Sequence, residues 1–272
     1  MTDVDGINTN IPAVARRYDA WLGGKDNFAA DRASATAISN VFPPITRAVA
    51  QNRRCLLRMV RYLAAERGVR QFLDIGCGIP MSQGNVHEIA QQIAPHSRIV
   101  YVDHDQMVAA HTRALQISTP EGAVAFHLGD LRQPEQIMSA ALVRSTLDFT
   151  RPVAVLLFAV LHFLPDDDAR TPVRDLMADL PAGSYLALSH ATYDPLPENV
   201  RAQMDAFTKP DSADGPFRPR THDEIASLLA GLDLVEPGLV ATVHWRPELE
   251  PPADPSLGDA RAICYAAVAV KP

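Results

Sequence analysis

The stretch Phe72-Leu73-Asp74-Ile75-Gly76-Cys77-Gly78-Ile79-Pro80 constrains the fold more than any other part of the chain. An apolar run that begins at Val69 leads directly into two glycines spaced Gly-x-Gly, which is typical of a buried parallel strand that turns tightly into a helix. In open α/β sheets, ligands bind outside the carboxyl ends of the strands, and glycines there let a ligand approach the backbone closely. Asp74 lies at the same edge.

The spacing of these glycines indicates which kind of ligand binds. A dinucleotide fingerprint reads Gly-x-Gly-x-x-Gly, with a pyrophosphate at the N-terminus of the helix that follows. In this chain Met81 stands at the position of the third glycine, and Asp74 precedes the turn. An acid without a third glycine favours a cationic amino-acid ligand over a pyrophosphate.

Composition and charge exclude several classes of protein. With 47% hydrophobic and 21% charged residues, the 272-residue chain has a globular rather than a disordered composition. The formal charge of −7 and the lack of a long basic block argue against a nucleic-acid partner. Three widely spaced cysteines suit neither a disulfide framework nor a zinc knuckle. No apolar stretch reaches the roughly 18 residues that span a bilayer, so we expect a cytoplasmic protein without membrane contact.

Beyond the glycine turn, strand and helix patterns alternate, as in a parallel sheet covered by helices on both faces. The most apolar run, residues 153–161, predicts a central strand. The acids after Pro165, residues 166–168, are interpreted as the first turn of a helix, where its dipole favours negative charge, and not as metal ligands. Thr221 to Glu224 resembles a capping box. The last two strands, 234–243 and 262–270, are predicted to form a hairpin. The other predicted strands are 69–75, 98–103, 124–128 and 184–190, and the other predicted helices are 85–93, 106–115, 198–207 and 225–230.

Residues 11–68 show helical spacing without strand-like alternation, so we expect a helical cap over residues 1–68 and a second domain over residues 69–272. Gly23 and Gly24 interrupt this helical region. Two interpretations stay open at the break. One is a lid over the ligand site, and the other is a helix C-terminus capped by a glycine, with Tyr18 and Trp21 anchored in the core.

Two further acids close predicted strands at the ligand edge. Asp103 lies 27 residues beyond Gly76, close to the interval at which an acid bonds the ribose hydroxyls in nucleotide-binding α/β folds. The alternative, a helix N-cap, fits Asp105 better. Asp130 follows the next strand, where it either receives the exocyclic amine of an adenine or caps a turn.

With Asp74-x-Gly76-x-Gly78, Asp103 and Asp130 in place, the chain resembles the class I S-adenosylmethionine-dependent methyltransferases. The string Leu22-Gly23-Gly24-Lys25-Asp26-Asn27-Phe28-Ala29-Ala30-Asp31-Arg32 narrows the resemblance to a bacterial S-adenosyl methyltransferase family long catalogued as a domain of unknown function. The match covers nearly the whole chain from Ile11 and favours the lid interpretation.

The resemblance implies a Rossmann-like α/β fold, with a seven-stranded, mostly parallel sheet whose last strand is antiparallel, and with S-adenosylmethionine as cofactor. Gly76 and Gly78 would make room for the methionine portion, and Asp74 would hold its amino group. The remaining residues that we assign to the donor site are Asp103 for the ribose, Asp130 and Leu131 for the adenine, Phe158 and Ala159 at the reacting edge, Tyr18 and Gly23 in the lid, and His104.

Methyl transfer from a sulfonium needs alignment and desolvation more than acid–base chemistry, and no metal is required. His162 and His190 follow predicted strands at the ligand edge, so either is a candidate base, although such histidines more often serve packing. His244 and Trp245 are candidates for an acceptor pocket. His104 and His111 have a poor spacing for a metal site.

The leading hypothesis is a methyltransferase that acts on the oxygen or nitrogen of a small molecule. The alternative is a non-catalytic protein that binds S-adenosylmethionine or S-adenosylhomocysteine and signals to a partner, because the donor-site acids are clear and an acceptor-side base is not. A nicotinamide oxidoreductase is disfavoured by the missing third glycine. A protein partner and a homo-oligomer both stay open.

Overall fold

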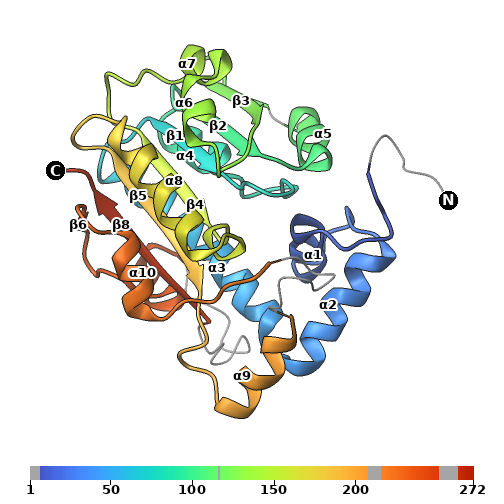
Figure 1. Ribbon diagram of the computed structural model, residues 1–272. Helices are drawn as coiled ribbons and strands as arrows, with labels where there is room; N and C mark the ends of the chain where they lie inside the picture. The colour runs from blue at the N-terminus through green and yellow to red at the C-terminus, as the bar shows by residue number, and fades with distance from the viewer. Residues whose placement is uncertain (1–6, 116, 208–215, 251–262) are drawn as a thin grey trace.

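The computed structural model describes residues 7–115, 117–207, 216–250 and 263–272. A single twisted sheet forms the centre of the molecule, and helices cover both of its faces (Figure 1). The strand order is β3-β2-β1-β4-β5-β8-β6, and β7 also pairs with β8. No helix in these ranges combines the length and the apolarity that a bilayer crossing needs.

The first five strands are parallel, and β8 runs antiparallel to β5. The sequence therefore predicted the fold class and the antiparallel last strand correctly, whereas the described part of the sheet has eight strands instead of the predicted seven. The strands are β1 (Gln71–Ile75), β2 (Arg98–Asp103), β3 (Ala123–Leu128), β4 (Ala154–Phe158), β5 (Tyr185–Ala191), β6 (Asp233–Leu234), β7 (Val240–Ala241) and β8 (Cys264–Val270).

The predicted strand 234–243 is broken into two short pieces. A turn in which the Gly238 N–H donates to the Val235 carbonyl separates β6 from β7, and Gly238 has a φ of +86°. Both pieces pair antiparallel with β8, so the predicted pairing of the last strands is present. The first residue of the predicted final strand, Ala262, lies outside the described residues.

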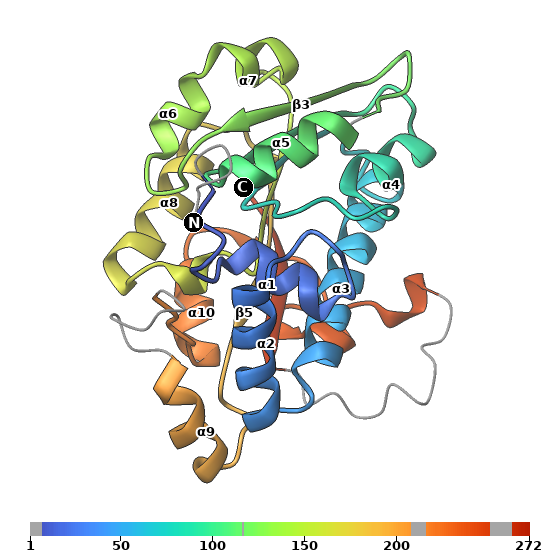
Figure 2. The ribbon, with the colours of Figure 1, turned by 90° about the vertical axis from the view of Figure 1, so that its right-hand side faces the viewer.

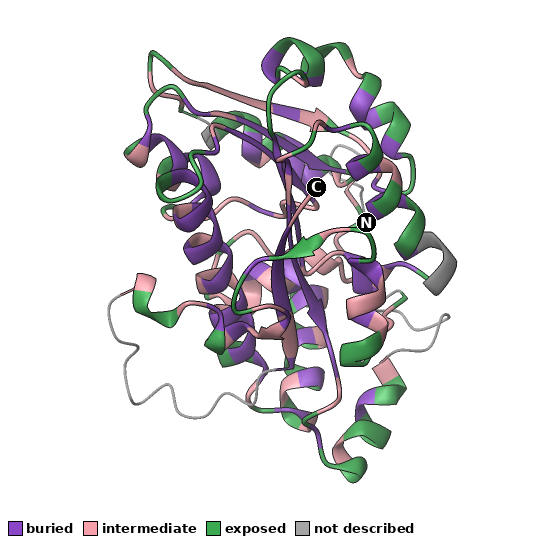
Figure 3. Cartoon of the chain, turned by 90° about the vertical axis from the view of Figure 1, so that its left-hand side faces the viewer, coloured by how far each residue is buried: buried purple, intermediate pink, exposed green. Residues whose placement is uncertain are grey.

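Successive side chains of a strand point to opposite faces of the sheet, so the strands contribute to two hydrophobic cores, one on each face. In β1, Phe72 packs into the core that lies under α3, α4 and α5, whereas Leu73 and Ile75 pack into the core under α6, α7, α8 and α10. Figure 3 shows the strands buried between the helical layers. The helices of these layers are α3 (Ile45–Ala65), α4 (Val86–Ile93), α5 (Gln106–Leu115), α6 (Pro134–Ser139), α7 (Ala141–Thr146), α8 (Asp166–Ala178) and α10 (His222–Leu228).

The N-terminal helices α1 (Val14–Trp21) and α2 (Ala29–Val41) stack beside the sheet (Figure 2). A third apolar cluster joins α2 and the first turns of α3 to α9 (Glu198–Met204), which comes from far along the chain. The second half of α3 packs on the sheet itself, from Cys55 to Ala64. Thus α3 contributes both to the cluster shared with α2 and α9 and to the main core.

Local signals set several helix starts. Thr221 Oγ1 accepts a hydrogen bond from the Glu224 N–H, and the Glu224 carboxylate accepts one from the Thr221 N–H, which is the predicted capping box of α10. Asp105 accepts a hydrogen bond from the Met107 N–H at 2.7 Å, so it caps α5 as expected. Helix α8 begins directly after Pro165.

The glycine turn after β1 is tightly packed on its β4 side. Gly76 has a φ of +73°, and a Cβ atom on it would lie 2.5 Å from Cγ2 of Val160. The residue at this position must therefore both adopt a left-handed conformation and leave room for Val160, and only glycine does both.

We predict that Gly76→Ala lowers the free energy of unfolding by about 2–5 kcal/mol, since a left-handed backbone strain adds to an overpacked contact. Chemical denaturation measures this. Gly231→Ala is the matched control, because Gly231 has a φ of +84° and open space where a Cβ would lie. Val160→Ala combined with Gly76→Ala should cost less than the sum of the single changes. Additive costs would contradict a Gly76–Val160 clash.

Candidate donor site

A cavity of about 810 Å³ opens at the carboxyl ends of β1, β2, β3 and β4, beneath α1. This is the edge of the sheet at which open α/β folds bind ligands, and the volume falls within the roughly 300–1,000 Å³ typical of ligand pockets. Ten of the eleven residues assigned to the donor from the sequence line this cavity: Tyr18, Asp74, Gly76, Gly78, Asp103, His104, Asp130, Leu131, Phe158 and Ala159.

Gly23 is the exception. It follows the last residues of α1 with a φ of +77° and donates its N–H to the Ala20 carbonyl, so it has the geometry of a helix C-terminal cap. Tyr18 and Trp21 pack against the cluster shared by α2, α3 and α9. The cap interpretation therefore describes the local structure, while Tyr18 on the same helix also reaches the cavity.

Asp103 ties the end of β2 to the glycine turn of β1. Its Oδ2 accepts a hydrogen bond from the Gly78 N–H at 2.9 Å, and its Oδ1 accepts one from the Asp105 N–H at 3.0 Å. Burial raises the pKa of Asp103, and these two backbone donors oppose that rise. Because a carboxylate has about four acceptor positions, each oxygen can accept a further hydrogen bond from a hydroxyl in the cavity.

Asp74 lies on the same face of the sheet as Asp103 and is 3% exposed. Burial raises the pKa of Asp74 to about 7; the nearby Arg53 guanidinium lowers it and the Asp103 carboxylate raises it. A buried carboxyl with such a pKa gains from a cationic partner, which would hold it in the ionised form.

Arg53 and Asn52 on α3 also line the cavity, and no sequence pattern pointed to them. Arg53 Nη2 donates to the Gly84 carbonyl at 2.8 Å, while its buried Nε has no hydrogen-bond partner within the described part of the chain. The same is true of the buried Oδ1 of Asn52, whose Nδ2 donates to the Tyr18 hydroxyl at 3.0 Å. Polar groups buried without partners mark a place where a polar ligand fits.

The end of β3 carries a second set of polar groups. Asp130 accepts hydrogen bonds from the backbone N–H and from the side chain of Arg132, at 2.9 and 3.0 Å. The Arg132 hydrogen bond lowers the pKa of Asp130, so this carboxylate stays ionised. Asp130 therefore shapes a turn and faces the cavity at once, and both of the roles weighed from the sequence fit its position.

The two candidate base histidines lie outside the residues that line the cavity. His162 Nδ1 accepts a hydrogen bond from the Ala191 N–H at 3.2 Å. His190 donates from Nδ1 to the Ala191 carbonyl at 2.8 Å and accepts at Nε2 from Arg220, also at 2.8 Å. Burial lowers the pKa of His162 well below its usual range and that of His190 to about 4. Both histidines therefore make the kind of structural contact weighed as the alternative from the sequence, and neither lines the cavity.

The two candidates for an acceptor pocket, His244 and Trp245, also lie away from the cavity. Trp245 is fully buried against Tyr62, with ring centroids 5.6 Å apart, and His244 precedes it. Cys77 lines the cavity, but burial raises the pKa of its thiol well above the usual range, which leaves it unreactive. Among the described residues, no cluster of three or more histidine, cysteine or acidic side chains has the arrangement of a metal site.

A family model described as S-adenosyl methyltransferase matches residues 1–272. The chain belongs to the S-adenosyl methyltransferase family. Members of this family use S-adenosylmethionine, and the enzyme is a methyltransferase of the class I fold. This confirms the resemblance, the cofactor and the enzyme class inferred from the sequence.

Solved structures agree with the family assignment. A protein described as a member of the DUF574 family, from Streptomyces avermitilis MA-4680, is 42% identical with a TM-score of 0.88, over 97% of this chain and 99% of that one. A methyltransferase candidate from Thermobifida fusca YX is 39% identical with a TM-score of 0.86, over 98% and 97% of the two chains. Magnesium protoporphyrin IX methyltransferase from Synechocystis PCC 6803, crystallised with S-adenosylhomocysteine, shares the fold at 14% identity, with a TM-score of 0.54 over 94% and 93% of the chains. No curated protein matches.

The raised pKa of Asp74 predicts opposite effects of pH on stability and on binding. The folded protein keeps this carboxyl protonated up to about pH 7, whereas the unfolded chain keeps it so only to about pH 4, so stability falls as pH rises between these values. We predict that Asp74→Asn raises the melting temperature by about 2–8 °C at pH 8 and leaves it unchanged at pH 4.

We expect the ammonium group of the ligand to pair with the ionised form of the Asp74 carboxyl and not with the protonated form. Affinity for S-adenosylhomocysteine should therefore fall up to about tenfold for each pH unit below 7, and Asp74→Asn should weaken binding and flatten this dependence. Calorimetry across pH measures it. Asp175→Asn, which removes a partly exposed carboxylate of α8 that does not line the cavity, is the control. A wild-type affinity that is constant from pH 5.5 to pH 7, a range chosen about the pKa of Asp74, would contradict a contact between Asp74 and the ammonium.

Proposed function

We propose that this protein transfers the methyl group of S-adenosylmethionine to an oxygen or nitrogen atom of a small molecule bound in the same cavity. The observation that carries the proposal is the convergence of Asp74, Asp103 and Arg53 on one cavity at the carboxyl edge of the sheet. S-Adenosylmethionine, when bound, would supply the methyl group from its sulfonium: the acceptor atom bonds the methyl carbon as the carbon–sulfur bond breaks, the sulfur becomes a neutral thioether, and the acceptor's proton passes to water.

The residues at this edge match the polar groups of the donor one by one. Asp74 and Arg53 form a carboxylate–guanidinium set that suits the ammonium and carboxylate of an amino acid, and the amide oxygen of Asn52 offers one more acceptor. Asp103 offers its remaining acceptor positions to two ribose hydroxyls. Asp130 and Leu131, one strand further along the edge, suit the amine and the ring of adenine.

The chain's own contribution to the reaction is alignment and exclusion of water. In-line displacement needs the acceptor atom held about 3–3.5 Å from the methyl carbon, which positioning alone can accelerate greatly. Ala159, with a φ of 52°, lines the cavity directly after β4 and is held by hydrogen bonds from its N–H to the carbonyl and the Oγ of Ser189, at 3.2 and 3.1 Å. Strained positions of this kind cluster at active sites. We assign Ala159 and Phe158 to the edge that faces the methyl group.

Two ligands separate the two ends of the proposed donor site. S-Adenosylhomocysteine carries both the adenosine and the amino-acid part, whereas 5′-methylthioadenosine lacks the amino acid. We predict that Asp103→Ala weakens binding of both ligands by about 1–3 kcal/mol, because ligand hydroxyls lose a buried partner. Calorimetric titration of folded variants measures this. An unchanged affinity for both ligands would show that Asp103 does not contact them.

Arg53→Met should give a different pattern. The substitution removes a guanidinium that contacts only the amino-acid part of the ligand. We therefore predict that binding of S-adenosylhomocysteine weakens at least about tenfold, while binding of 5′-methylthioadenosine changes less than about twofold. Circular dichroism verifies the fold, since Arg53 also bonds the Gly84 carbonyl. Equal weakening of both ligands would show that Arg53 acts through the structure and not through the ligand.

A further inference from the structure

The walls of the cavity differ in chemistry according to the elements that form them. Among the described residues that line it, every charged side chain comes from α1, from α3 or from the ends of β1, β2 and β3. Residues 11–14, 158–160, 163–165 and 216 form a separate part of the lining, and each of them is apolar. We call this part the apolar wall.

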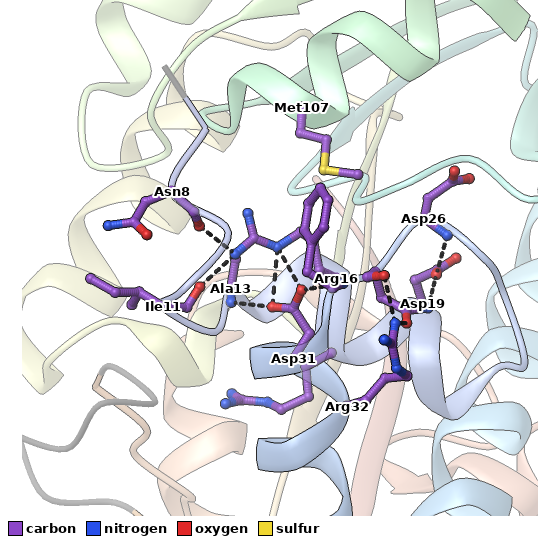
Figure 4. A network of polar contacts seen from close by, with 12 residues as sticks. Asn8, Ile11, Ala13, Arg16, Asp19, Asp26, Asp31, Arg32 and Met107 are labelled. Atoms are coloured by element: carbon purple, nitrogen blue, oxygen red, sulfur yellow. Dashed lines mark hydrogen bonds and ion pairs between the residues drawn. The ribbon is translucent and has the colours of Figure 1, made fainter. Parts of the chain in front are cut away.

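One half of the apolar wall is the N-terminal segment that leads into α1, and a buried ion pair fixes its backbone. Asp31 is fully buried, and its carboxylate accepts hydrogen bonds from the Ala13 N–H at 2.8 Å and from Arg16 Nε at 2.9 Å. Arg16 Nη2 in turn donates to the Asn8 carbonyl at 3.1 Å and to the Ile11 carbonyl at 2.5 Å. Figure 4 shows these bonds converging from α1 and α2 on the segment that lines the cavity.

The segment is therefore ordered even though its apolar side chain at the cavity is not covered. Ile11 is 54% exposed, although its carbonyl accepts a hydrogen bond from the buried Arg16. A fixed and exposed apolar side chain at the lip of a cavity can gain free energy when an apolar ligand covers it.

The other half of the apolar wall is backed by an aromatic cluster. Phe163 lines the cavity, and its ring centroid lies 4.4 Å from that of His162 and 5.7 Å from that of Phe217. These two rings pack against Phe163. Contacts within the protein therefore hold both halves of the apolar wall.

We propose that the apolar wall binds the methyl acceptor, and that this acceptor is an uncharged, ring-containing molecule. The inference rests on the proposed function, because it concerns the second ligand of the same cavity. A carboxylate or ammonium placed against this wall would be desolvated without a described partner, and such burial is strongly unfavourable. A neutral ring gains apolar contact with Ile11 and edge or face contacts with Phe163.

Three 2-substituted naphthalenes of different charge test the proposal: 2-naphthol is neutral, 2-naphthoate is an anion and 2-naphthylmethylammonium is a cation. Each is titrated calorimetrically into the full-length protein saturated with S-adenosylhomocysteine. We expect 2-naphthol to bind at least about tenfold more tightly than either charged compound. Failure of 2-naphthol to bind at millimolar concentration, or tighter binding of a charged compound, overturns the proposal.

Variants at Ile11 show whether the wall makes the contact. Because Ile11 is half exposed, its replacement spares the core. Ile11→Ala should weaken 2-naphthol about three- to tenfold, and Ile11→Glu should reverse the preference toward the cation. Affinity for S-adenosylhomocysteine is the internal control and should not change.

The two proposals fail in different ways. If the protein binds S-adenosylhomocysteine but does not prefer the neutral naphthalene, or if substitution of Ile11 does not change the affinity for 2-naphthol, the acceptor proposal is wrong and the donor site stands. If the folded protein does not bind S-adenosylhomocysteine, both proposals are wrong.

Discussion

The turn from Gly76 to Gly78 is fixed from both sides, and the position of the donor site depends on it. On the β4 side, Val160 occupies the space that a Cβ of Gly76 would need, while on the β2 side the Asp103 carboxylate accepts the Gly78 N–H at 2.9 Å. A tight turn that leaves its cavity face open requires glycine at both positions, with φ values of +73° and +66°. The same short segment therefore joins the ends of β1, β2 and β4 and lines the cavity.

The two-residue period of the strands then decides which charges meet. Asp74 and Asp103 fall on the face of the sheet that α3 covers, together with Phe72 and Tyr101, and Arg53 of α3 comes close to the Asp74 carboxylate. Burial of two acids near each other is costly, and it raises the pKa of both. The arrangement becomes favourable when a ligand adds a cation and hydroxyl donors. We interpret this as stability that is given up in the free protein for donor binding.

The sequence predicted what short-range patterns encode and missed what packing decides. The glycine turn, the acids after β2 and β3 and the alternation of strands and helices are local, and the residues they indicated line the cavity. Arg53 was missed because helical spacing assigns an arginine outside the apolar stripe to a solvated face, and the register of α3 over β1 cannot be read from spacing. His162 and His190 were chosen because they are at or just after strand ends. In the structure, the Nδ1 atom of each ring forms a hydrogen bond with a backbone group of Ala191. The apolar wall involves residues about 150 positions apart, so no local pattern joins them.

A crystal structure of the protein with S-adenosylhomocysteine tests the central claim most directly. We expect the ribose hydroxyls to lie within hydrogen-bond distance of Asp103, the ammonium and carboxylate of the amino-acid part to contact Asp74 and Arg53, and the Asp103–Gly78 bond to be retained. An adenosyl group bound elsewhere, or one whose amino-acid part points away from α3, would contradict this assignment of the donor site.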